Sequence, residues 1–330
     1  MFGLFRTRAK PEPAPPATPM PVAHGAEHML RRLEWTVIRR LDGLLQGDYR
    51  TLLRGSGLDL ADLREYQHHD DVRHIDWNVT ARLQVPHVRV FTEDREMAAW
   101  FLLDLSASVD FGSSEQRKRH VSAEFVAVIA RLLTRHGNRV GALLYGSGVD
   151  TVLPARGGRV HVLELLHHMQ RRPPGRESGG TRLDELLRSA LGTIRRRSTV
   201  FVVSDFISAP GWEKPLGELA LHHDVLAVRL LDPMELDLPD LGLMPIRDAE
   251  TGEQLLVDTH DTAFRKRFAR LAAQREAELR QAFARAGVDT LELSTGDDLV
   301  QAVLRFADLR KRRSRLSSAS MVATRTHAAA

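Results

Sequence analysis

The chain has 330 residues, 43% of them hydrophobic and 27% charged, which suits one enlarged α/β domain with extensions or two small domains. It contains no cysteine, so disulfides, thiolate metal sites and cysteine nucleophiles are excluded. The formal net charge is +4, but most arginines alternate with acids, a pattern typical of a solvated, ion-paired surface. We therefore expect no nucleic-acid partner.

The N-terminal part predicts a lead-in followed by an extension. Residues 10–22 contain six prolines, which predicts a disordered lead-in over 1–25. The chain shows neither the apolar core of a signal peptide nor about 18 uninterrupted apolar residues, so we expect a cytoplasmic protein without a membrane span. Residues 26–45 repeat apolar positions at helical spacing and predict a helix, which opens an extension over 26–96. The alternation after Pro86 predicts a strand beginning at His87.

A regular order of strands and helices follows over 97–312. The apolar run 198–206 is typical of a strand buried on both faces of a parallel sheet. Ser113 or Ser114 is expected to cap a helix that ends at Gly137. Further elements are expected as strands at 98–103, 139–146, 224–232 and 288–295, hairpins at 150–158 and 242–258, and helices at 160–170, after Thr181, at 262–286 and near the end of the chain.

This order predicts an α/β fold, with a doubly wound, mostly parallel sheet flanked by helices. The N-terminal helix and the β-containing extension precede it. Residues 313–330 are expected to form a disordered basic tail, and the basic run 310–315 is expected to be solvated.

Two aspartates end apolar strands and predict a shared site. Asp104 follows "WFLL" and Asp205 follows "VFVVS", and ligands bind at the carboxyl ends of the strands in such sheets. Ser106 and Ser108 follow Asp104 at every second position, so one loop carries a carboxylate and two hydroxyls, a set that suits Mg²⁺ better than Zn²⁺. Thr181 and Asp205 are expected to complete the shell and to leave one coordination position open.

Each of these residues also has a purely structural interpretation. Asp104 could cap a helix at the end of its strand, since aspartate is a common cap. Thr181 could cap the helix that follows, because Asp184 stands three residues on, close to the spacing of a capping box. Capping and metal ligation by Thr181 can coexist.

The five residues resemble the metal-ion-dependent adhesion site (MIDAS) of the von Willebrand factor A fold. Asp104, Ser106, Ser108, Thr181 and Asp205 match the five family positions in the family's order. The resemblance implies that the serines and the threonine touch Mg²⁺, or Mn²⁺ as the alternative metal, while the aspartates act largely through bound water. It also implies a vWA-like, Rossmann-like domain over 97–312 that binds a partner's carboxylate at the open position.

A wider resemblance covers roughly residues 54–312. The run "LREYQHHDDVRHIDWNVTARL" is similar to the hallmark of the bacterial "domain of unknown function 58" (DUF58) proteins. The shared positions are Arg64, Tyr66, Asp71, Arg73, Ile75, Asp76, Trp77 and Arg82, whereas His69 replaces a glycine that usually precedes the paired aspartates. The resemblance implies work with a MoxR-type AAA+ ATPase in the assembly or maturation of a protein complex.

The extension itself suggests either a hydrolytic metal centre or a structural network. Its histidines, at positions 68, 69 and 74, lack the i, i+4 spacing that places two imidazoles on one helical face. We therefore favour a network in which arginines pair with aspartates while Tyr66 and Trp77 pack. Its charged members are Arg64, Arg73, Arg82, Asp70, Asp71 and Asp76.

Two functions are compatible with the site. The first is a non-enzymatic, metal-dependent protein-binding module. The alternative is a Mg²⁺-dependent phosphohydrolase that uses Asp104, but Ser106 stands where such an enzyme needs a second aspartate as general acid and base. The sequence also lacks a P-loop, so we do not expect nucleotide hydrolysis.

Overall fold

The structure is a computed structural model that describes residues 22–45, 62–67, 72, 75–90, 98–113, 116–171, 180–247 and 253–310. The predicted lead-in, except for its last four residues, and the whole predicted tail lie outside these ranges, as do Asp70, Asp71 and Arg73. Among the residues described, no helix combines the length and the apolar character needed to cross a bilayer.

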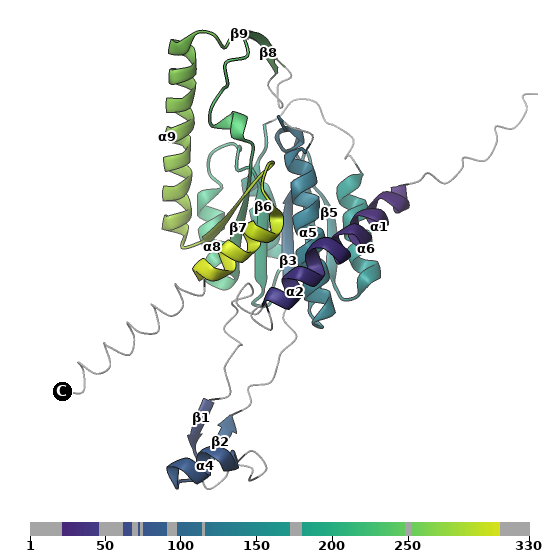
Figure 1. The fold of residues 1–330 in the computed structure, drawn as a ribbon, viewed down its shortest axis with the longest axis vertical. Coiled ribbons are helices and arrows are strands. Elements are labelled where there is room, and N and C mark those ends of the chain that lie inside the picture. The colour runs from purple at the N-terminus through teal and green to yellow at the C-terminus, as the bar shows by residue number, and fades with distance from the viewer. Residues whose placement is uncertain are drawn as a thin grey trace, which may run out of the picture.

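A six-stranded sheet forms the centre of the protein (Figure 1). Its strands are β3 (Ala98–Asp104), β4 (Arg139–Tyr145), β5 (Val149–Arg156), β6 (Thr199–Ser204), β7 (Asp224–Leu231) and β10 (Asp289–Ser294). They lie in the order β10-β7-β6-β3-β4-β5, and all neighbours are parallel except the edge pair β4 and β5. This confirms the predicted doubly wound, mostly parallel α/β sheet.

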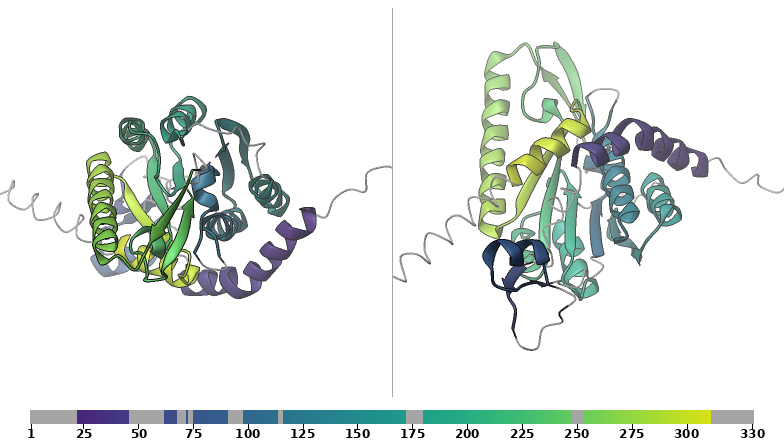
Figure 2. Two further views of the ribbon diagram at one scale, coloured as in Figure 1. Left: turned by 90° about the horizontal axis from the view of Figure 1, so that it is seen from above. Right: turned by 60° about the horizontal axis from the view of Figure 1, so that its bottom comes forward.

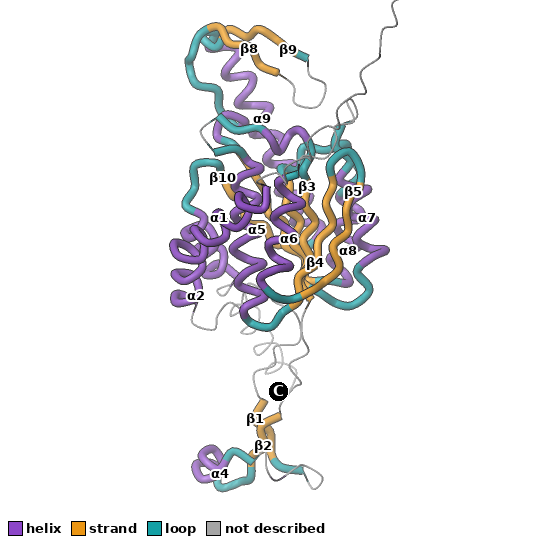
Figure 3. Tube along the Cα trace, turned by 90° about the vertical axis from the view of Figure 1, so that its right-hand side faces the viewer, coloured by secondary structure: helices purple, strands orange, loops and turns teal. Residues whose placement is uncertain are grey.

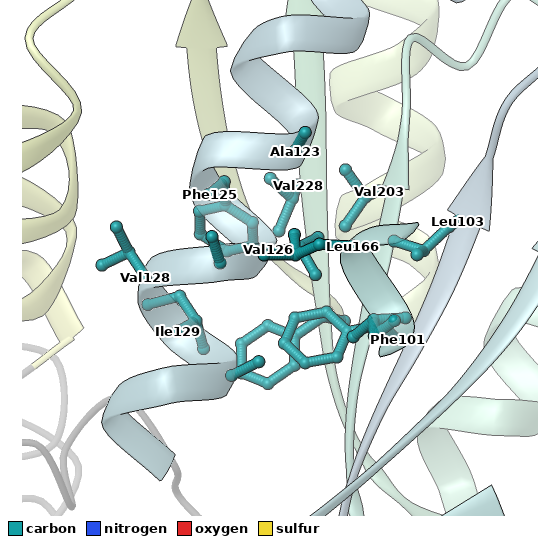
Figure 4. Close-up of a cluster of buried hydrophobic side chains, with 14 of the residues drawn as sticks. Phe101, Leu103, Ala123, Phe125, Val126, Val128, Ile129, Leu166, Val203 and Val228 are labelled. Atoms are coloured by element: carbon teal, nitrogen blue, oxygen red, sulfur yellow. The ribbon is translucent and has the colours of Figure 1, made fainter. Parts of the chain in front are cut away.

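One face of the sheet is covered by the N-terminal helix, α5, α6 and the C-terminal helix (Figure 2). The N-terminal helix runs through α1 (Val22–Leu33), the π-helical turn η1 (Glu34–Ile38) and α2 (Arg39–Leu45). The other elements are α5 (Lys118–Arg135), α6 (Arg159–Gln170) and the helix at 299–310. Phe101 of β3 stacks on Phe201 of β6 with ring centroids 5.0 Å apart, and Phe125 of α5 meets Phe201 edge-on. Figure 4 shows this cluster, which anchors α5 against the sheet.

The opposite face is covered by α7 (Leu183–Thr193), α8 (Glu213–His222) and α9 (Thr262–Ala286). The side chains that alternate with Phe101 along β3, such as Leu102, point into this second core. Phe206, Trp212 and Phe283 form an aromatic cluster in it, with ring centroids 4.9 to 5.8 Å apart. Both faces of the central strands are therefore buried, as their continuous apolar runs predict.

An antiparallel hairpin of β8 (Leu243–Arg247) and β9 (Gln254–Asp258) projects beyond the sheet beside the start of α9 (Figures 1 and 3). Register pairs Pro245 with Leu256. The face that they share with Leu243 is exposed, since Leu243 is 68% and Leu256 67% accessible. The hairpin thus presents leucines to the solvent, and the short 3₁₀ helix η4 (Pro233–Glu235) precedes it in the chain.

The extension forms a separate small sheet at the opposite end of the molecule from the hairpin (Figures 1 and 3). Strand β1 (Asp62–Glu65) pairs with β2 (His87–Val90), and helix α4 (Trp77–Leu83) lies between them in the chain. Asp76 is buried at the start of α4 and accepts a hydrogen bond from the N–H of Val79 at 3.2 Å.

The expectation that Trp77 packs is wrong, because its side chain is 70% exposed on α4. Tyr66 is half-buried, and its backbone N–H donates to the carbonyl of Pro86 at 2.8 Å. Arg64 pairs in β1 with Val88, and Arg82 is exposed. The predicted arginine and aspartate network stays a prediction, because three of its members lie outside the described residues.

Two further sequence expectations are corrected. Helix α5 begins at Lys118, with Arg117 as its N-cap, and not after Ser113 or Ser114. The reason is that the N–H of Ser113 donates to the carboxylate of Asp232 at 2.9 Å, which holds this residue in a loop. Arg310 is not solvated, because it is buried and ion-paired with Asp224 at 2.7 Å and Asp289 at 3.2 Å.

Candidate metal site

The predicted site lies where the strand order of the sheet reverses. Numbered in chain order and read from the β5 edge, the six strands run 3-2-1-4-5-6, and strands 1 and 4 are β3 and β6. Ligands bind in open α/β sheets at this switch point, outside the carboxyl ends of the strands. Asp104 is the last residue of β3 and Asp205 directly follows β6, so the topology places both carboxylates there.

Asp104 is fully buried between two hydrogen-bond donors. One carboxylate oxygen accepts the backbone N–H of Ser106 at 3.0 Å, and the other accepts the hydroxyl of Ser204 at 2.6 Å. Burial raises the pKa of Asp104, the negative charge of Asp205 raises it further, and the hydrogen bonds offset only part of this, so the pKa reaches about 6. The two carboxylates therefore interact strongly.

Ser106 and Ser108 bring their hydroxyls together beside Asp104. Their Oγ atoms lie 3.1 Å apart, and both side chains are buried, Ser106 at the N-cap of the 3₁₀ helix η3 (Ala107–Asp110) and Ser108 within it. The loop is fixed at its start, where the N–H of Leu105 donates to the carbonyl of Tyr145 on β4. The structural interpretation of Asp104 as a helix cap is wrong, because Ser106 is the N-cap of this helix and the N–H that Asp104 accepts is that of Ser106 itself.

Thr181 belongs to a segment that is tied to the same edge of the sheet. Its carbonyl accepts the N–H of Ala209 and the hydroxyl of Ser208, both at 2.9 Å, from the loop that follows Asp205. The next residue, Arg182, donates its N–H to the hydroxyl of Tyr145 at 3.0 Å. Thr181 is buried.

The alternative role of Thr181 as a helix cap is wrong. The N-cap of α7 is Arg182, and no side-chain cap hydrogen bond is present there. The helix therefore begins one residue later than a cap at Thr181 requires. Helix capping thus does not explain why a threonine is buried at this edge of the sheet.

Asp205 is paired with a buried lysine that the sequence analysis did not include. Nζ of Lys118, the first residue of α5, lies 2.7 Å from Oδ2 of Asp205 and 2.6 Å from Oε1 of Glu235. Burial of the ammonium lowers the pKa of Lys118, but the two carboxylates outweigh burial, so its pKa lies above the ordinary value. Lys118 is therefore a charged group within the site.

The residue after Asp205 adopts a backbone conformation that is unusual for a side chain of its size. Phe206 has φ 58° and lies in the left-handed region, where non-glycine residues are uncommon. The aromatic contacts with Trp212 and Phe283 hold it, and its N–H donates to Ser204 at 2.9 Å. The turn also lets the N–H of Ile207 reach Oδ1 of Asp205 at 3.0 Å. Strain of this kind is concentrated at functional sites.

The donor set fits a hard divalent cation. It offers two carboxylates and three hydroxyls, all oxygens, from three loops that meet at one edge of the sheet. Within the described ranges, no three His, Asp or Glu side chains gather into a metal-binding group. The proposed site has two carboxylates and three hydroxyls, so it is not a group of three such side chains. Contacts join Asp104, Ser106 and Ser108 directly, and the pKa of Asp104 reports the proximity of Asp205.

Comparison with known proteins agrees with the predicted family. A family model described as "Protein of unknown function DUF58" matches residues 62–278. The uncharacterized protein Mb1516 of Mycobacterium bovis is 39% identical over 287 residues, which cover 86% of this chain and 89% of the relative.

Two solved structures align with the chain at low identity. BatB from Bacteroides thetaiotaomicron aligns with a TM-score of 0.43 and 14% identity over 66% of this chain and 99% of its own. The VWA domain of SpRpn10 aligns with a TM-score of 0.34 and 13% identity over 63% of this chain and 93% of its own. The family match and the extent of the mycobacterial alignment together show that the chain belongs to the DUF58 family.

Proposed function

We propose that this protein is a non-enzymatic, metal-dependent protein-binding module. The observation that carries the proposal is the pair of buried carboxylates, Asp104 and Asp205, at the switch point of the sheet, with the hydroxyls of Ser106 and Ser108 beside them. Asp104, Ser106, Ser108, Thr181 and Asp205 would hold Mg²⁺, with Mn²⁺ as the alternative. The bound cation would supply an open coordination position for an Asp or Glu carboxylate of the partner.

The charges of the buried cluster support this proposal. Asp104 and Asp205 contribute two buried carboxylates and Glu235 a half-buried one, and among the described contacts the ammonium of Lys118 reaches Asp205 and Glu235 but not Asp104. Charges buried in protein are stable only when they are paired and hydrogen-bonded. The donors described for Asp104 are neutral, and burial beside Asp205 raises its pKa, so a divalent cation at this position would supply the positive charge that pairs with it.

The exposed hairpin that follows η4 in the chain favours a protein as the partner. Leu243 and Leu256 expose most of their side chains on the hairpin that follows η4, and η4 carries Glu235 of the buried cluster. Exposed apolar side chains on one projecting element are typical of a surface that contacts another protein. By its resemblance to the family, a MoxR-type AAA+ ATPase is the partner we propose.

The phosphohydrolase is not favoured. Asp104 has no exposed surface, and its oxygens already accept the N–H of Ser106 and the hydroxyl of Ser204. Asp110, the acid nearest in sequence, lies on η3 and contacts Arg119 at 3.4 Å. Nothing in this arrangement supplies the general acid that hydrolysis of an aspartyl phosphate requires.

The proposal is tested by measuring partner binding with and without metal. The immobilised protein is exposed to the purified MoxR-type ATPase of its own organism in MgCl₂ or in EDTA. Binding should require Mg²⁺ and should be lost in Asp104→Ala and Ser108→Ala, whereas Asp110→Ala, on the same loop, should bind normally. Binding that persists in EDTA would refute the proposal, and phosphatase turnover that is lost in Asp104→Ala would favour the enzyme.

A further inference from the structure

Lys118 is the feature of the site that the proposed function does not use. Its side chain is wholly buried, although the ammonium is among the groups most costly to remove from water. Two carboxylates contact it, Asp205 at 2.7 Å and Glu235 at 2.6 Å, and the ring of Phe111 lies 5.8 Å from Nζ. A lysine that only supported the fold would not need to end on a residue of the candidate metal site.

The ammonium is held from the other side by a rigid frame. Glu235 uses its second carboxylate oxygen to accept the N–H of Asp232 at 3.1 Å, which completes a capping box around η4. Asp232 in turn accepts the N–H of Ser113 at 2.9 Å and the hydroxyl of Thr295 at 2.8 Å. The loops after β3, β7 and β10 therefore fix Glu235, and Glu235 fixes Lys118.

Asp205 is fully satisfied by the protein alone. Oδ2 accepts Lys118 and Oδ1 accepts the N–H of Ile207 at 3.0 Å. Asp104 differs, because the donors described for it are neutral. The two aspartates of the site are thus not equivalent: one has a resident positive charge and the other does not.

We propose that Lys118 is a tethered counter-ion that holds Asp205 in place without metal and weakens the binding of a divalent cation at the site. The inference rests on the proposed metal-dependent function and concerns its regulation. Because a partner's carboxylate adds a negative charge that offsets Lys118, metal and partner bind cooperatively, and each raises the affinity for the other by the same factor. Lys118 is therefore a positioning residue that controls the affinity of the site for the metal when no partner is bound.

The test compares metal affinity in variants that separate local charge from net charge. Lys118→Met removes the ammonium, and Lys118→Arg keeps a positive charge. The double variant Lys118→Met/Glu235→Gln removes one charge of each sign and avoids two unpaired buried carboxylates, so it covers the case in which Lys118→Met does not fold. Glu235→Gln alone leaves Lys118 with Asp205 as its only carboxylate partner among the contacts described above.

The readout is the dissociation constant for Mn²⁺, followed by the electron paramagnetic resonance signal of the free ion at pH 7.5 and confirmed by competition with Mg²⁺. Lys118→Met should bind at least tenfold more tightly than the wild type, because it removes the repulsion between a single and a double positive charge in one partly desolvated site. The double variant should also bind more tightly. Lys118→Arg should bind like the wild type, and Glu235→Gln should bind more weakly.

The outcomes distinguish the counter-ion role of Lys118 from the proposed metal-dependent function. If the wild type binds Mn²⁺ and both Lys118→Met variants bind it equally well or more weakly, the counter-ion role of Lys118 is overturned and the proposed metal site is kept. Binding by the Lys118→Met variants but not by the wild type would support the counter-ion and overturn metal-dependent function in the native chain. No binding by any variant would overturn both.

Discussion

Replacing Asp104 by asparagine should stabilise the metal-free protein at neutral pH. Asp104 has a pKa of about 6 when folded, against 3.8 for an ordinary aspartate, because it is buried and faces Asp205. The folded protein therefore binds this proton more tightly than the unfolded chain does, and ionisation of Asp104 opposes folding. The shift corresponds to about 3 kcal/mol at pH 8 and to roughly half of that at pH 5.

The asparagine removes this cost but loses one hydrogen bond. Ser204 donates its hydroxyl to Asp104, and an asparagine NH₂ at that position cannot accept it, which costs about 1 kcal/mol. Asp104→Asn should therefore be more stable than the wild type by about 2 kcal/mol at pH 8 and by less than about 1 kcal/mol at pH 5. The sign follows from the raised pKa, since the penalty is absent below the unfolded pKa and grows as pH rises through the folded pKa.

Urea denaturation in EDTA at pH 5 and pH 8 measures both differences. Asp110→Asn is the matched control, because it changes a partly exposed aspartate on the same loop and should stay within about 1 kcal/mol of the wild type at both pH values. A variant less stable than the wild type at pH 8, or a difference that does not grow with pH, would refute the reasoning.

Three other substitutions test the frame around the site by urea denaturation. Phe201→Ala should lower the free energy of unfolding by about 3 to 5 kcal/mol, because its ring stacks on Phe101 in the core. The control Leu221→Ala, on α8 and 83% exposed, should lower it by less than about 0.5 kcal/mol. Equal losses would contradict the core assignment. Gly141→Ala places a Cβ 2.7 Å from the ring of Trp100 and should destabilise the protein by about 1 to 3 kcal/mol. The control Gly217→Ala, in α8, places its Cβ 4.0 Å from the nearest atom and should stabilise the protein by about 0.5 to 1 kcal/mol. A Gly141→Ala variant as stable as the wild type would show that the contact with Trp100 relaxes freely. Burial raises the pKa of Asp232, but hydrogen bonds from Ser113, Thr295 and Met234 lower it more, so its folded pKa lies below 3.8. Asp232→Asn should therefore cost about 1 to 3 kcal/mol at pH 7, with the cost falling only below about pH 4. A loss that stays the same at pH 3 would speak against the charged frame.

The strand ends of the site could be predicted from the sequence because their physical signals are local. Asp104 and Asp205 each end a continuous apolar run, and such runs are typical of central strands in a parallel sheet. The parallel order of these strands brings their carboxyl ends to one edge, so two local patterns predict a contact between residues 101 positions apart.

Lys118 and its partners could not be predicted in the same way. Lys118 stands in the run "QRKRH", which has the composition of a solvated surface, and the start of α5 depends on the contact between Ser113 and Asp232, 119 residues away. One weak signal was present, because the first turn of a helix that follows a central strand lies at the carboxyl edge of the sheet. Trp77 fails for the opposite reason, since hydrophobicity alone does not tell a packed tryptophan from an exposed one.

The central claim is that Asp104, Ser106, Ser108, Thr181 and Asp205 bind one divalent cation. Isothermal titration calorimetry of MgCl₂ into the purified, metal-free protein tests it most directly. The account predicts one Mg²⁺ per chain, with binding lost in Asp104→Ala and in Ser108→Ala and kept in Asp110→Ala. Absence of saturable binding at millimolar Mg²⁺, or equal binding by the wild type and Asp104→Ala, would contradict it.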